Sequence, residues 1–101
     1  MKKVLYIENC HAEVLLGVFG LFEKLANSYE LIALATPSLY ANIQNTKYAS
    51  KVCVSSDQTI MLRDVSRIML QHKISLVIYG TITDQDYSQT LSHLREIAKF
   101  N

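Results

Sequence analysis

The sequence predicts an α/β fold in three layers, in which a parallel sheet of four strands lies between layers formed by about four helices. Short, almost uninterrupted apolar runs occur four times, which is typical of strands that are buried on both faces of a parallel sheet. Amphipathic stretches with helical spacing separate these runs, and this alternation favours right-handed crossovers within one sheet. The 101 residues are expected to form a single domain, residues 1–101.

The composition excludes several classes of function. Ten basic residues are scattered along a chain with a net charge of +1, so the basic stripe of a duplex-binding surface is missing and no nucleic-acid partner is expected. The longest apolar run, Val14–Phe22, is far shorter than the ~20 residues of a membrane span. Cys10 and Cys53 form neither a C-x-x-C pair nor a metal-ligand spacing, which predicts a cytoplasmic protein without a metal site.

The first strand and helix are predicted from the start of the chain. Residues 3–7 form a short apolar run, and Asn9 is expected to cap a helix that extends to about Asn27. Gly17 and Gly20 lie one turn apart inside this helix. Because a glycine in mid-helix costs about 1 kcal/mol relative to alanine, we expect a close approach of the helix to the sheet at these positions.

The next elements are shorter. Residues 29–35 form the second strand, and Thr36 followed by Pro37 is a start signal for a short helix that ends near Asn45. The third strand, residues 51–54, is expected to lie at the periphery of the sheet.

The second half of the chain completes the alternation. A strongly amphipathic helix is predicted from Gln58 to about His72, capped by one of residues 55–57. Residues 74–79 form the fourth strand, which Gly80 ends. Residues 83–86 have the spacing of a capping box for a last helix that reaches about Lys99.

Two strand orders fit this pattern, and both make the first strand central. The Rossmann-like order 3-2-1-4 is preferred, and the flavodoxin-like order 2-1-3-4 is the alternative. In the preferred order the chain reverses direction between the first and fourth strands, where open α/β sheets bind ligands. The residues predicted to line this ligand crevice are Glu8, Asn9, His11, Gly80, Thr81 and Asp84.

The corner after the first strand favours neither of two familiar chemistries. Residues 8–12 contain no glycine, and Glu8 adds a negative charge where a pyrophosphate would bind. Cys10 is the alternative nucleophile, activated by the helix dipole and by His11. Its position resembles the phosphocysteine of IIB subunits of sugar phosphotransferase systems, but those proteins continue with a loop rich in Gly, Ser and Thr, which is missing here. No catalytic residue is therefore assigned.

Three segments together resemble the N-terminal domain of ATP-grasp ligases over about two thirds of the chain. They are Leu-Ala-Thr-Pro-Ser at 34–38, the segment 46–57 with its Tyr-Ala-Ser-Lys, and the segment 68–84 with its strand Ile-Ser-Leu-Val-Ile-Tyr-Gly. The resemblance implies a domain that forms one wall of a ligand crevice and is not catalytic alone. It also implies that this chain binds no cofactor by itself, and that ATP or a nucleotide sugar would be held through a further domain.

Two other functions are left open. The corner with His11 and the turn Gly80–Thr81 are similar to the acceptor-side, N-terminal half of GT-B glycosyltransferases. A protein-interaction module is the other alternative, because an edge strand and the narrow apolar stripe of the last helix favour a homodimer. The expected partners are a small-molecule ligand, further domains of a larger protein, or a second copy.

Overall fold

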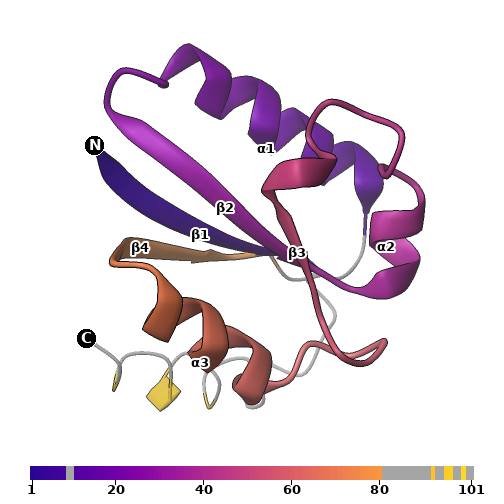
Figure 1. The fold of residues 1–101 in the computed structure, drawn as a ribbon, viewed down its shortest axis with the longest axis vertical. Coiled ribbons are helices and arrows are strands. Elements are labelled where there is room, and N and C mark those ends of the chain that lie inside the picture. The colour runs from indigo at the N-terminus through magenta and orange to yellow at the C-terminus, as the bar shows by residue number, and fades with distance from the viewer. Residues whose placement is uncertain (9–10, 81–91, 93–94, 97–98, 100–101) are drawn as a thin grey trace.

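The computed structural model contains a four-stranded parallel sheet between two helical layers (Figure 1), and it describes residues 1–8, 11–80, 92, 95–96 and 99. The order of the strands is β3-β2-β1-β4, and every neighbouring pair is parallel. This is the predicted α/β fold with the preferred strand order. The strands are β1 (Lys2–Glu8), β2 (Tyr29–Ala35), β3 (Val52–Val54) and β4 (Ile74–Tyr79).

Helices cover both faces of this sheet. Helices α1 (Ala12–Lys24) and α2 (Pro37–Ala41) lie on one face, and α3 (Leu62–Gln71) lies on the other (Figure 1). A short 3₁₀ helix, η1 (Ala49–Lys51), leads into β3. The last predicted helix falls largely outside the described residues.

The two faces of β1 explain why residues 4–7 are apolar without interruption. Val4 and Tyr6 belong to the core under α1, whereas Leu5 and Ile7 belong to the core under α3. Successive side chains of a strand point to opposite faces, so a strand covered by helices on both sides needs apolar residues at every position.

The predicted start and glycine contacts of α1 are wrong. The N-cap is His11, two residues after the predicted cap Asn9, and its side chain makes no capping hydrogen bond. A Cβ added to Gly17 or Gly20 would meet no atom within 4 Å. Both positions point away from the core that contains Leu15 and Phe19, so the helix does not approach the sheet through its glycines.

The predicted start is correct for α2 and wrong for α3. Thr36 caps α2 as predicted, because its Oγ1 accepts a hydrogen bond from the N–H of Leu39 at 3.4 Å and Pro37 follows it. Helix α3 begins only at Leu62, four residues after the predicted start at Gln58.

Candidate functional site

The strands are added in one direction from β1 to β3, and β4 is then added on the other side of β1. The carboxyl ends of β1 and β4 are therefore neighbours, and Glu8 and Gly80 lie side by side. The N–H of Gly80 donates a hydrogen bond to the carbonyl of Ile7 at 2.8 Å. A Cβ at position 80 would lie 2.8 Å from Oε2 of Glu8 and 2.7 Å from the hydroxyl of Tyr6. Contacts below 3 Å are closer than real Cβ atoms show, so glycine is the residue that fits between these groups without displacing them.

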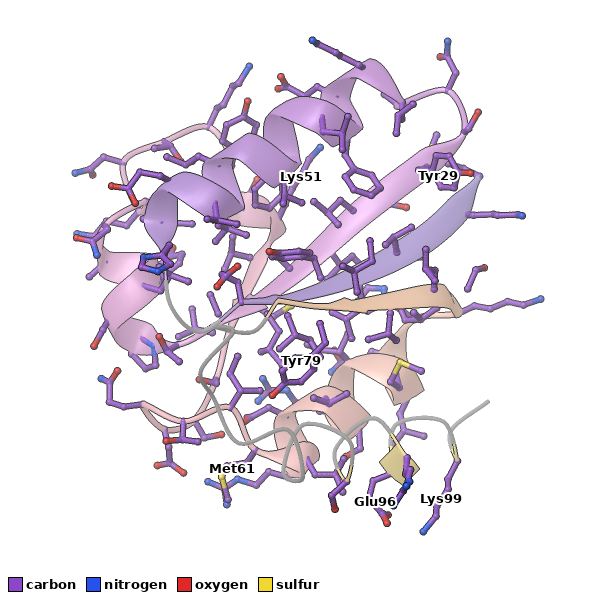
Figure 2. The ribbon with its side chains drawn as sticks, turned by 180° about the vertical axis from the view of Figure 1, so that it is seen from behind. Tyr29, Lys51, Met61, Tyr79, Glu96 and Lys99 are labelled. Atoms are coloured by element: carbon purple, nitrogen blue, oxygen red, sulfur yellow. The ribbon has the colours of Figure 1, made fainter. Side chains whose placement is uncertain are left out.

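Glu8 ends β1 as a buried polar residue, with 4% of its surface exposed. The hydroxyl of Tyr6 donates a hydrogen bond of 2.6 Å to Oε2 of Glu8. Residues two apart in a strand share a face, so both side chains lie on the side covered by α1. Tyr79, the residue before Gly80, packs instead against the core on the α3 side (Figure 2).

His11 is the third crevice residue that the structure describes. It is exposed at the N-terminus of α1, and its carbonyl accepts a hydrogen bond from the N–H of Leu15 at 3.2 Å. The positive end of the helix dipole therefore lies near the carboxyl edge of the sheet. The other predicted residues, Asn9, Cys10, Thr81 and Asp84, lie outside the described residues, and ligand binding by this set of side chains stays a prediction.

The carboxyl ends of β2 and β3 form the second half of this edge. The N–H of Ser55 bonds the carbonyl of Ala35 at 2.8 Å, and the Ser55 hydroxyl donates to the carbonyl of Asp57 at 2.7 Å. Above β2, the hydroxyl of Ser38 donates to Oε1 of Gln58 at 2.6 Å. The bonds to Ala35 and Ser38 therefore tie the segment after β3 to the end of β2 and to α2.

Asp64 is a buried acidic residue that the sequence did not single out. It is 1% exposed, and its Oδ1 accepts hydrogen bonds from the hydroxyl of Ser56 at 2.7 Å and from the Ser56 N–H at 3.1 Å. Its Oδ2 accepts from the N–H of Met61 at 3.3 Å. Arg67 lies 3.9 Å from Oδ1. Asp64 thus fastens the loop after β3 to the first turn of α3.

These contacts set the protonation of Asp64. Burial alone would raise its pKa, but the hydrogen bonds from Ser56 and Met61 and the charge of Arg67 outweigh burial and lower the pKa below its ordinary value. One sequence signal was visible, because Asp64 stands at helical spacing between the buried residues Ile60 and Ile68. An acidic residue on the apolar face of a helix predicts a buried, bonded carboxylate.

A hollow of about 630 Å³ lies at the opposite, amino edge of the sheet. Its lysines are Lys2 and Lys3 at the start of β1 and Lys73 just before β4. Helices α1 and α3 end at this edge, and cations are stabilised near helix C-termini. The clustering is therefore explained by the helix dipoles, and the carboxyl edge is the better candidate for a ligand site.

Three further observations restrict the chemistry of the described part of the chain. Among residues 1–8 and 11–80 and the few described beyond them, no group of three His, Cys, Asp or Glu side chains is placed to hold a metal ion. Burial raises the pKa of the Cys53 thiol, which makes it a poor nucleophile. None of the helices in this described part has the length and hydrophobicity that a bilayer span requires.

A scan against protein-family models gave no match, and searches of curated proteins and of solved structures gave no significant match.

Proposed function

We propose that this chain is the Rossmann-like, N-terminal domain of a nucleotide-dependent ligase of the ATP-grasp type. In this proposal it forms one wall of a ligand crevice and is not catalytic alone. The observation that supports it is the strand order β3-β2-β1-β4, because the reversal between β1 and β4 places Glu8 beside Gly80. Ligands of open α/β sheets bind in the crevice outside such a reversal.

The chemistry of the corner suggests which part of a nucleotide faces this wall. Glu8, which is almost buried and accepts a hydrogen bond from Tyr6, is the acidic group at this corner, and the described part of the corner has no run of glycine N–H groups that could hold a pyrophosphate. A carboxyl group accepts hydrogen bonds from hydroxyl and amino groups. We therefore assign the ribose or sugar hydroxyls to this wall, and the phosphates to a further domain of the protein.

The acidic side chains along this edge are held by hydrogen bonds from other residues of the chain. Such contacts fit a domain that supports a ligand and is not itself catalytic. Tyr6 donates to Glu8, and Ser56 and Met61 donate to Asp64. Side chains held in this way shape a wall. The cysteine pattern of the sequence supports a cytoplasmic location as part of the same proposal.

Calorimetric titration with ATP, ADP and a nucleotide sugar tests the proposal. We expect at least one of them to bind, and we expect Glu8→Gln to weaken that binding about fivefold, because a neutral amide is a weaker acceptor by roughly 1 kcal/mol. The control is Glu30→Gln, which changes an exposed acidic residue near the amino edge. Binding of none of the three ligands by the folded wild-type chain would overturn the proposal, as would equal effects of the two variants.

A further inference from the structure

One flank of α1 carries an apolar stripe that the described part of the fold leaves partly uncovered. We name it the α1 seam; it consists of the exposed residues Val14, Leu21 and Leu25 and of Val18, which is partly buried and packs against the core under α1. Val14 is 46% exposed and Leu21 is 55% exposed, although both are large apolar residues. A helix on the surface of a domain normally turns such a stripe to the core, and α1 has a separate core stripe around Leu15 and Phe19.

The other flank of α1 contacts the segment before β3, so the seam lies on the side of β4. Glu23 forms an ion pair of 2.8 Å with Lys47, and the ring of Phe19 stacks on Tyr48 at a centroid distance of 5.0 Å. Lys47 and Tyr48 lie just before β3, at one end of the sheet order. With a turn of 100° per residue, the seam lies on the other flank, toward β4.

Apolar surface is also exposed on β4. Leu76 is paired in register with Val4, whose side chain lies in the core under α1, so Leu76 is on the same face of the sheet. It is 51% exposed. Neighbouring Ile78 packs only partly against the same core. The seam and Leu76 therefore lie on the same side of the sheet, and both expose apolar surface there.

We infer that this face binds the same face of a second copy, with the two α1 helices antiparallel across a two-fold axis. The seam has the spacing 4-3-4, which is the a and d pattern of a coiled coil. This spacing is symmetric about a point between Phe19 and Gly20. A single axis at that point therefore sets Val14 against Leu25 of the second copy and Val18 against Leu21 of the second copy.

The charges beside the seam favour the antiparallel orientation. Glu13 lies in the first turn of α1, Lys24 lies in its last turn, and both are exposed. About the same axis, Glu13 of one copy lies within about two residues, roughly 3 Å along the helix, of Lys24 of the other. A parallel pair would bring like charges together, which is destabilising.

The size of the face sets the strength of the association. A helix of 13 residues is about 20 Å long, and with the exposed part of β4 the face covers on the order of 400 Å² per copy. Such an interface is smaller than the ~1,200 Å² in total that stable complexes bury. We expect a weak dimer with a Kd on the order of 100 µM.

Sedimentation equilibrium of the full chain between about 10 µM and 1 mM tests the inference. The mean mass should rise from monomer toward dimer, and Leu21→Glu should weaken the association at least tenfold. The matched control is Leu70→Glu, because Leu70 is an exposed leucine on α3 with 81% of its surface accessible. A strict monomer at 1 mM, or a dimer that survives Leu21→Glu through another surface such as the β4 edge, would overturn the inference.

Charge reversal tests the orientation independently. Glu13→Lys should weaken the dimer about threefold, and adding Lys24→Glu should restore the wild-type Kd to within about twofold. Thermal melting of each variant verifies that the fold is intact. If the double variant is weaker than Glu13→Lys alone, the antiparallel arrangement is wrong.

Discussion

The hydroxyl of Tyr6 donates a hydrogen bond of 2.6 Å to the carboxyl group of Glu8, two residues further along the same strand. Both residues are buried near the carboxyl end of β1, and Gly80 lies against both of them. A polar pair in this position is stable only while each group keeps its partners. The carboxyl edge is therefore the part of the described fold where small changes should have large effects.

Tyr6→Phe should lower the free energy of unfolding by about 1–3 kcal/mol, because it removes a donor from a buried acceptor. Urea denaturation measures the change. Tyr40→Phe is the control, since Tyr40 lies on α2 and is only partly buried, and a loss below about 0.5 kcal/mol is expected there. Equal losses in the two variants would show that the hydrogen bond to Glu8 contributes nothing.

Gly80→Ala should destabilise the fold by about 1–3 kcal/mol, because the new Cβ displaces the Tyr6 hydroxyl or Glu8. In a Tyr6→Phe background the cost should fall, since the hydroxyl that the methyl group meets is gone. Chemical denaturation of the two single variants and the double variant measures this coupling. Strict additivity would contradict the contact.

Gly17→Ala should have the opposite sign to Gly80→Ala. A Cβ at Gly17 meets open space, and alanine is favoured over glycine in mid-helix by about 1 kcal/mol. The midpoint of thermal unfolding, measured at low protein concentration where the chain is monomeric, should therefore rise. A fall would mean that Gly17 has a contact that the fold does not show.

Asp64→Asn should destabilise the protein most at neutral pH. The folded-state pKa of Asp64 lies below its ordinary value, so the aspartate contributes stability above about pH 4, and this contribution is lost as the pH falls through the folded pKa. The difference in unfolding free energy between wild type and variant should shrink from pH 7 to pH 3. Asp57→Asn, at an exposed residue paired with Arg63, should show a much smaller difference. A wild-type advantage that grows on acidification would refute the assignment.

Cys53 should react slowly with iodoacetamide at pH 7, because burial raises its thiol pKa. Mass spectrometry of a Cys10→Ser variant isolates the rate at Cys53. Denaturation in urea should raise that rate by at least tenfold. Equal rates before and after denaturation would show that burial does not protect the thiol.

The sequence predicts an element well where a local pattern alone determines it. The bounds of β2 and β4 follow from largely apolar runs, and the start of α2 follows from Thr36 and Pro37. The start of α3 was missed because several capping residues precede it, and the hydrogen bond from the N–H of Met61 to Asp64 caps the real start. A single sequence does not reveal such a choice between competing caps.

The sequence likewise predicts only part of the candidate site. The preferred strand order placed Glu8 opposite Gly80, because the carboxyl ends of parallel strands share one edge. The close fit of Gly80 against Tyr6 depends on residues far apart in the chain, so sequence spacing does not predict it. The outward direction of Gly17 depends on which flank of α1 faces the sheet, and the composition of the helix left that open.

We propose that a nucleotide-type ligand binds at the carboxyl edge between β1 and β4. A ¹H–¹⁵N NMR titration of the full chain with ATP and with a nucleotide sugar measures this directly. We expect the amide signals of Glu8, His11 and Gly80 to shift most, while those of Ser28 and Lys73 at the amino edge stay in place. The largest shifts at the amino edge, or no shifts at millimolar ligand, would contradict it.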